Sequence, residues 1–304
     1  MAILPAPILV AGAINTDLVA TMSRAPGAGE TITGTGFAIH GGGKGGNQAM
    51  AIARSGGDAH LVGAIGDDDF GKARVADLAE DGVRTEWVQV SKQVSSGVAL
   101  IFVEECGENR IAYVPGATTT VPGSHTAAAC MALSPTHVLA TNELPHDSLL
   151  ALFASAREVG ARVIFNATPE PETVRELLEW VSVLIVNEVE AQVLLEVDDL
   201  RDTQGAVAQL LDLGLETVVL TGGKEGAWIG DRDGVDQYRP PVAEAVDTTG
   251  AGDTFCGAFV AELARGETIR DAVRYAVSAS ALSVTKPGAQ SSIPTREEVT
   301  AILA

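Results

Sequence analysis

Short apolar runs alternate with amphipathic segments along most of the chain. Six of the runs are continuous and followed by turn residues, which is typical of buried strands; they cover residues 8–14, 61–65, 137–140, 162–166, 183–186 and 217–221. Apolar residues recur at helical spacing in the segments between and after them, at 47–55, 69–80, 147–159, 188–196, 202–213, 251–264 and 268–284. The alternation predicts an α/β fold with a mostly parallel central sheet and helices on both of its faces.

Two pairs of strand-like segments interrupt the alternation, because no helix separates their members. One pair covers residues 18–22 and 31–39, and the other covers 97–104 and 110–113 with a turn signal at 105–109. We expect a small antiparallel sheet, formed from about 16–40 and 96–114, that projects from a single domain spanning residues 1–304. Beside the ends of the main strands it would serve as a lid; an edge extension without a function is the alternative.

Charge narrows the range of possible partners. The 304 residues carry a formal net charge of −20, and 46% of them are apolar, which is enough to build a large core. A field of this sign repels phosphate backbones and anionic lipid, so we expect neither a nucleic-acid nor a membrane partner. A bound nucleotide would need a local positive field from a helix end, a lysine or a metal ion.

Cysteine usage favours a reducing compartment. Cys106, Cys130 and Cys256 are an odd number at wide spacing, which fits neither a disulfide framework nor a zinc motif. The first apolar run follows no basic segment, so we interpret it as a strand and not as a secretion signal. These features predict a cytoplasmic protein.

The strongest local signal is Asp-Thr-Thr-Gly-Ala-Gly-Asp-Thr-Phe at 247–255, directly before a helical pattern. The small residues Gly250, Ala251 and Gly252 let a ligand approach the backbone, and unpaired N–H groups at a helix start attract anions. A carboxylate at Asp253, beside such an anion hole, is useful if it handles a proton. Capping of the helix is the alternative role for Asp253.

A second glycine-rich segment, His-Gly-Gly-Gly-Lys-Gly-Gly-Asn, covers residues 40–47. It is not a Walker A loop, because Ala38 stands where that motif requires Gly and Gly45 stands where it requires Ser or Thr. Glycines with Lys44 and Asn47 at a helix start suit a ligand rich in hydroxyl groups, since amide and backbone groups can read hydroxyls and the ammonium can meet a phosphate. A mobile glycine linker is the alternative.

Other polar segments follow predicted strands. Asn15 and Asp17 follow the first strand, and Glu143 follows the strand at 137–140. The segments 187–190 and 221–226 follow the next two strands, and ligands of α/β sheets bind beyond the carboxyl ends of strands. We therefore expect all these segments to meet at one edge of the sheet.

The order and spacing of these motifs resemble those of the ribokinase-like sugar kinases, the phosphofructokinase-B family. The resemblance runs from about residue 8 to residue 295, and the segments 41–49 and 247–255 carry it. It implies ATP-dependent phosphorylation of D-ribose at the 5-hydroxyl, which yields ribose 5-phosphate and ADP.

The resemblance also implies roles for individual residues. Asp253 matches the base that takes the proton from the 5-hydroxyl, and the anion hole at 250–252 holds the transferring phosphoryl group. Besides Asp253, the positions that match sugar contacts are Asn15, Asp17, Gly42, Gly43, Lys44, Asn47 and Glu143, with Ala99 and Ile101 in the lid. Nucleotide contacts match Asn187, Glu190, Thr221, Gly223, Lys224, Gly226 and Gly252, where Glu190 is linked to magnesium and phosphate. A monovalent-cation site matches Asp247, Thr249, Ser283, Lys286, Gly288 and Ser292, mostly through backbone carbonyls.

The implied cofactors are ATP, Mg²⁺ and K⁺, and the implied assembly is a homodimer through the β lid. Ala13 and Val277 stand where members of the family often have Ser and His, which leaves the sugar and the nucleotide preference open. The alternatives are a kinase of the same fold acting on a nucleoside or on 2-keto-3-deoxygluconate, and a catalytically silent sugar-binding regulator.

Overall fold

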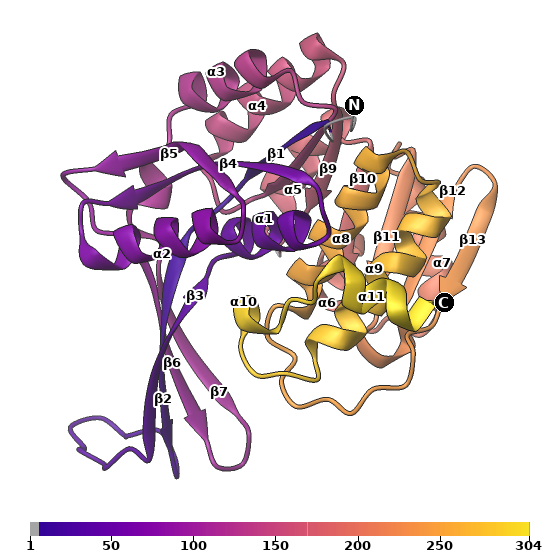
Figure 1. The fold of residues 1–304 in the computed structure, drawn as a ribbon. Helices are drawn as coiled ribbons and strands as arrows, with labels where there is room; N and C mark the ends of the chain where they lie inside the picture. Colours follow the sequence, from indigo (N-terminus) through magenta and orange to yellow (C-terminus); the bar gives the residue numbers. More distant parts are fainter. Residues whose placement is uncertain (1–5, 169, 304) are drawn as a thin grey trace.

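The computed structural model describes residues 6–168 and 170–303, and its centre is a nine-stranded sheet (Figure 1). In spatial order the strands are β13 (Gly234–Tyr238), β12 (Ala227–Asp231), β11 (Thr217–Thr221), β10 (Val183–Asn187), β9 (Arg162–Asn166), β8 (His137–Thr141), β1 (Pro7–Ala11), β4 (Asp58–Gly66) and β5 (Arg84–Ser91). All neighbours from β11 to β5 are parallel, and the β11–β12 and β12–β13 pairs at one edge are antiparallel. The predicted mostly parallel sheet is confirmed.

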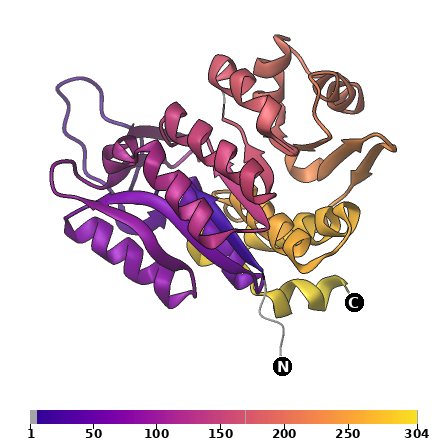
Figure 2. The same ribbon diagram turned by 90° about the horizontal axis from the view of Figure 1, so that it is seen from above.

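Helices cover both faces of this sheet, as the alternation predicted (Figures 1 and 2). Side chains alternate between the faces along each strand. Ile8 and Val10 therefore pack on one helical layer, and Leu9 on the other. The first layer consists of α1 (Lys44–Arg54), α2 (Asp69–Glu80), α8 (Ala251–Arg265), α9 (Ile269–Ser283), α10 (Ala289–Ser292) and α11 (Arg296–Leu303). The second layer consists of α3 (Gly123–Leu133), α4 (His146–Val159), α5 (Pro171–Leu177), α6 (Glu188–Leu195) and α7 (Thr203–Leu211). No helix in these two layers, as far as the described residues go, is long and apolar enough to cross a membrane.

A second, four-stranded sheet, which we call the lid, projects from the main sheet (Figure 1). Its order is β3 (Gly36–Gly42), β2 (Asn15–Met22), β6 (Gly97–Glu104) and β7 (Asn109–Val114). The two outer pairs are antiparallel, as predicted, while the central pair β2–β6 is parallel. The four strands lie within residues 15–42 and 97–114.

Several predicted boundaries are wrong. The first strand ends at Ala11 and not at residue 14, because Gly12 begins a bend, and the first lid strand begins at Asn15 and not at residue 18. Residues 31–35 are not part of a strand, because Thr35 N–H instead bonds Thr21 O in a loop beside Gly34, and glycine weakens a strand. The helix expected from residue 47 begins at Lys44, so part of the glycine-rich segment is helical. The carboxylate of Glu143, in the turn after β8, accepts hydrogen bonds from the N–H groups of this early first turn.

Helices α1 and α8 cross in direct backbone contact at Gly257. A Cβ atom built on Gly257 would lie 2.5 Å from the carbonyl oxygen of Gln48 and 2.5 Å from Cβ of Ala51. Both atoms are fixed to the backbone of α1, so neither can move away by a side-chain rotation. Only glycine allows this crossing, which sets the distance between the first turns of the two helices.

Gly257→Ala should destabilise the fold by about 1–3 kcal/mol, since the added methyl group overpacks the crossing. This loss should appear even though alanine is the better helix former. Urea denaturation measures the change in the free energy of unfolding. Gly27→Ala is the matched control, because its Cβ would meet only the Glu30 carboxylate at 3.5 Å in an exposed loop. Equal stability of the two variants would contradict the crossing described above.

Candidate active site

The carboxylate of Asp253 lies in the first turn of α8 and faces the first turns of α1. Asn47 Nδ2 donates to Asp253 Oδ2 at 2.9 Å, and Gln48 Nε2 donates to Oδ1 at 3.1 Å. The side chain is only 7% exposed. The two glycine-rich segments, separated by about 200 residues in the sequence, are therefore joined through this one carboxylate, as the predicted convergence requires.

The predicted anion hole precedes and begins α8. Gly250 is the N-cap with φ of 74°, a left-handed conformation that favours glycine, and its Cβ would lie 2.9 Å from Cα of Ala289. Ala251 N–H is bonded to Thr248 O at 3.2 Å. Gly252 follows in the first turn, where N–H groups have no acceptor within the helix, and a Cβ there would meet open space. The backbone at Gly252 can therefore be approached by an anion.

Lys44 begins α1 and brings a positive charge to Asp253. Burial disfavours its ammonium, yet the carboxylates of Asp253, Glu190 and Glu143 outweigh burial and raise the pKa of Lys44. The group is thus charged at neutral pH and supplies the local positive field that the acidic chain requires.

Glu143 joins three elements through its carboxylate. Oε2 accepts from the N–H of Ala13 at 2.9 Å, from the N–H of Gly45 at 3.3 Å and from the hydroxyl of Thr141 at 2.9 Å, while Oε1 accepts from the N–H of Lys44 at 3.3 Å. Burial raises the pKa of Glu143 although these donors oppose the shift. Its main contacts are with the backbone, and its implied contact with a sugar stays a prediction.

Two buried amides, Asn47 beside Asp253 and Asn15 opposite Gly42 in the lid, have oxygens that accept no hydrogen bond. Asn15 Oδ1 and Asn47 Oδ1 have no hydrogen-bond partner among residues 6–168 and 170–303, and both side chains are 5% exposed. Such acceptors are costly to bury unless a ligand donates to them. Hydroxyl groups are suitable donors.

Asp17 completes this polar cluster, which we define as Asn15, Asp17 and Asn47. Desolvation raises the pKa of Asp17 to about 6, with Asp253 adding to the shift. Asp17 lies over Gly42, where any Cβ would lie 2.3 Å from its Oδ2. Gly43 is equally constrained by φ of 85° and by the backbone of Ala13 and Asn15. The glycines at 42 and 43 therefore allow β3 to pass close to β2 before α1 begins.

Strand register puts Ala99 and Ile101 on the same face of the lid as Asp17. Asp17 pairs with Ala99, and Val19 pairs with Ile101 two residues further along. Residues paired across strands share a face, as do residues two apart in one strand. Both predicted lid positions thus lie on the side that carries the polar cluster.

A cavity of ≈ 330 Å³, which we call the inner cavity, opens beside Lys44. Its lining includes Lys44, Asn166, Asn187, Glu190, Thr221, Gly223 and Gly252. Asn187 and Glu190 form a reciprocal capping box at the start of α6, with both bonds at 2.8 Å. Burial raises the pKa of Glu190, while Lys44 opposes the shift.

A larger cavity of ≈ 480 Å³, the outer cavity, shares Thr221, Gly223 and Gly252 with the inner one. Lys224 and Gly226 also line it, so the implied nucleotide residues lie around two adjoining cavities. The other lining residues are mostly apolar and come from the segment after β13 and from α9: Pro240, Pro241, Val242, Ala243, Ala245, Val277 and Ala281. Sequence reasoning missed the 240–245 wall, because it has neither periodicity nor a motif.

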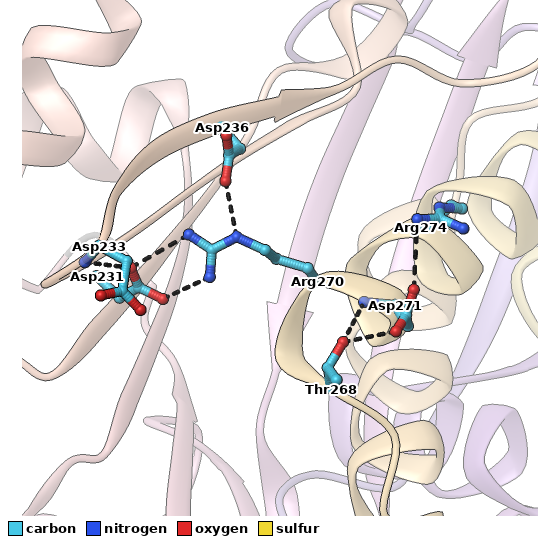
Figure 3. A network of polar contacts seen from close by, with 7 residues as sticks. All are labelled: Asp231, Asp233, Asp236, Thr268, Arg270, Asp271 and Arg274. Atoms are coloured by element: carbon cyan, nitrogen blue, oxygen red, sulfur yellow. Dashed lines mark hydrogen bonds and ion pairs between the residues drawn. The ribbon is translucent and has the colours of Figure 1, made fainter.

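One arginine fixes the walls of the outer cavity relative to each other (Figure 3). Arg270, in the first turn of α9, bonds Asp236 on β13 at 2.7 Å and Asp231 at the end of β12 at 2.8 and 3.3 Å. The hydrogen bonds from Arg270 lower the pKa of Asp231. The hairpin that leads into the 240–245 wall is thereby held against the helix that forms the opposite wall.

The implied cation-site residues lie on two adjacent segments behind the anion hole. Asp247 accepts from the N–H and hydroxyl of Thr249 at 2.9 and 2.7 Å and from Gly288 N–H at 2.8 Å. The hydroxyls of Ser283 and Ser292 donate to nearby backbone carbonyls. Lys286 extends away, to Glu298 at 2.9 Å. Only the backbone of Lys286 can therefore face such a site.

The chain matches known proteins over almost its full length. The family model described as pfkB family carbohydrate kinase matches residues 6–296. A ribokinase of Schizosaccharomyces pombe is 36% identical over 305 residues, with 96% of each chain covered, and one of Bacillus subtilis is 35% identical, with 97% of this chain and 99% of the relative covered. The solved structure of Arabidopsis thaliana ribokinase complexed with ribose and ATP superposes with a TM-score of 0.89 at 28% identity, covering 98% of this chain and 99% of that one.

The matches cover both glycine-rich segments and the residues that join them at Asp253. The resemblance expected from the motifs is thereby confirmed at the level of the family. This chain belongs to the pfkB family of carbohydrate kinases.

Proposed function

We propose that this protein transfers the γ-phosphoryl group of ATP to the 5-hydroxyl of D-ribose. The observation that carries the proposal is the amide of Asn47, which contacts the carboxylate of Asp253 and whose Oδ1, like Oδ1 of Asn15 on β2, has no partner within the described residues. Ribose hydroxyls would donate to these oxygens and replace the hydration that burial removes. Relatives at about 35% identity over the full chain are ribokinases, which supports ribose as the sugar.

Each part of the site has a role in this reaction. The 5-hydroxyl oxygen forms a bond to the γ-phosphorus as the bond to the β,γ-bridging oxygen breaks, and ADP leaves. Asp253 takes the hydroxyl proton. Lys44 and the N-terminus of α8 stabilise charge on the transferring group, because both supply positive potential before the reaction begins. The inner cavity accommodates the phosphates and the outer, more apolar cavity the base.

A magnesium ion bound with ATP would neutralise phosphate charge and orient the leaving group. The chain offers Glu190 near it, a buried carboxylate whose Oε2 is already held by the N–H of Asn187. Burial raises the pKa of Glu190, and a cation bound beside it would favour its ionised form. The residues of the inner cavity therefore fit a magnesium–phosphate group. The cytoplasm stays the predicted location.

A coupled assay of ADP release tests the substrate. Ribose should give the highest kcat/KM in a panel with nucleosides and 2-keto-3-deoxygluconate. A nucleoside or the keto-sugar as the best acceptor would replace ribose within the same mechanism. Sugar binding without ADP release from any acceptor would favour a silent binding protein instead.

Asp253→Asn should lower kcat by about 10²–10⁴-fold, the usual contribution of a general base. Binding of ATP and ribose, measured by calorimetry, should change little, because the amide keeps the shape and one acceptor oxygen. Asp199→Asn, on an exposed loop, is the matched control and should keep full activity. Near-full turnover by Asp253→Asn would show that another group takes the proton.

We further propose that two lids pair to form a homodimer. Phe37, Ile39 and Leu100 are exposed by 67%, 49% and 40%. Leu18 pairs with both Ile39 and Leu100, so these side chains share the lid face opposite to Asp17. An apolar sheet face of this kind requires a cover, and a second copy supplies the same face by two-fold symmetry.

The protein should sediment at twice its chain mass of 31.3 kDa, whereas Ile39→Glu should shift it toward the monomer. A buried unpaired carboxylate at the centre of the interface is the physical cause. Ile302→Glu places the same charge on an apolar residue of α11 that is 44% exposed and should leave the dimer intact. Analytical ultracentrifugation at micromolar concentration measures the mass of each variant. A monomeric wild-type protein would refute the dimer.

A potassium-sized cation is proposed to act through the segments around Asp247 and Gly288. The carboxylate, hydroxyl and carbonyl oxygens found there are hard ligands. Val284 O accepts from the N–H groups of Val246 and Asp247, which ties the two segments together. Gly250 contacts Ala289, the residue after Gly288. A cation that orders these two segments would therefore also fix the backbone of the anion hole.

Turnover should be higher in potassium than in sodium or tetramethylammonium salts at equal ionic strength. The increase should disappear in Asp247→Ala, which removes the carboxylate that holds Gly288. The same ADP-release assay measures it. Equal rates in all three salts would leave the two segments with a packing role only.

A further inference from the structure

Gln48 is a buried polar residue for which the reaction described above has no role. It lies in the α1–α8 contact and is 0% exposed. Its Nε2 donates to Asp253 Oδ1 at 3.1 Å and to Asn166 Oδ1 at 3.0 Å. Its own Oε1 has no partner among the described residues. A buried amide with an unpaired oxygen stabilises the fold poorly, so packing alone does not account for it.

A chain of hydrogen bonds fixes which way the Gln48 amide points. Asn166 Nδ2 donates to the backbone oxygen of Ile185 on β10 at 3.2 Å, so Asn166 must present its oxygen to Gln48. Gln48 must then present its NH₂ group, which is also the group that can donate to Asp253. The backbone of the central sheet thus sets the orientation of the donor that meets the carboxylate.

We propose that Gln48 is a positioning residue for Asp253, one that holds Oδ1 and leaves Oδ2 as the atom that takes the sugar proton. The two oxygens have different surroundings: Oδ1 accepts from Gln48, which is fully buried, and Oδ2 accepts from Asn47 in the polar cluster. A carboxylate held at one oxygen cannot turn its plane freely, so the other oxygen keeps its direction. This inference rests on the proposed function.

The same bond opposes the acidic surroundings of the carboxylate. Asp17 on β2, Glu143 after β8 and Glu190 on α6 all repel a negative charge at Asp253, and Lys44 on α1 attracts it. A hydrogen bond donated to the ionised form favours that form. Loss of the donor should therefore make the base easier to protonate.

Gln48→Met, which keeps the length and removes the donor, tests the proposal. The kcat value should fall about 10²-fold, a typical effect of misplacing a reacting group. The KM values for ribose and ATP should stay within about twofold, because neither ligand loses a contact. The acid limb of the kcat–pH profile should move to higher pH. A residue with a structural role alone would not produce this limb shift.

Thr126→Val is the matched control. Thr126 is equally buried and donates to Ser148 O at 2.7 Å between α3 and α4, far from Asp253 in the fold. It should lose stability in thermal unfolding without a change in kcat or in the pH profile. Unaltered kcat and pH profile in Gln48→Met, or the same kinetic change in Thr126→Val, would overturn the proposal.

Two further measurements keep the outcome clear. If Gln48→Met does not fold, Gln48→Glu serves as the test, because it keeps the shape and replaces the donor with an acceptor that repels Asp253. Its kcat should also fall, while binding of ribose and ATP measured by calorimetry persists. An undiminished kcat would refute the proposal. Wild-type protein and Asp253→Asn are assayed alongside. An inactive wild type would refute the proposed function itself, whereas an active wild type, an inactive Asp253→Asn and a fully active Gln48→Met would refute only the role of Gln48.

Discussion

The active site depends on the backbone contact between α1 and α8 at Gly257. Because no side chain separates the helices there, the amides of Asn47 and Gln48 reach the carboxylate of Asp253 directly. A second glycine contact works in the same way, since a Cβ on Gly45 would lie 2.5 Å from the backbone of Gly12 at the end of β1. Glycine thus provides close approach between elements, which is a different use from the flexibility of a linker.

Local charge resolves the difficulty of binding a nucleotide to a chain with a net charge of −20. Lys44 is kept charged by the buried carboxylates around it, and burial raises the pKa of two of them, Glu143 and Glu190. The start of α8 adds positive potential without adding a side chain. Positive and negative groups therefore alternate within the site, and the net charge of the chain does not reveal this arrangement.

The register of β2 gives the lid two chemically different faces. Asp17 and Ala99 point to one face, where the polar cluster lies, and Ile39 and Leu100 point to the other, where they are exposed. Because side chains alternate with a period of two, a shift of one residue would exchange these faces. The parallel pairing of β2 with β6 is thus tied directly to the site.

The sequence by itself determined the layered α/β architecture, the lid and the two glycine-rich helix starts, because periodicity, turn residues and helix signals act over a few neighbouring positions. It did not predict β5, whose alternating polar residues reflect an edge strand, or the 240–245 wall. The contacts of Gln48 with Asn166 and Asp253 span 118 and 205 residues. Nor did it predict that Glu143 would meet four donors from three elements, or that the central lid strands would be parallel. Only the tertiary structure decided these features, because they depend on contacts between segments far apart in the sequence, and no local pattern records such contacts.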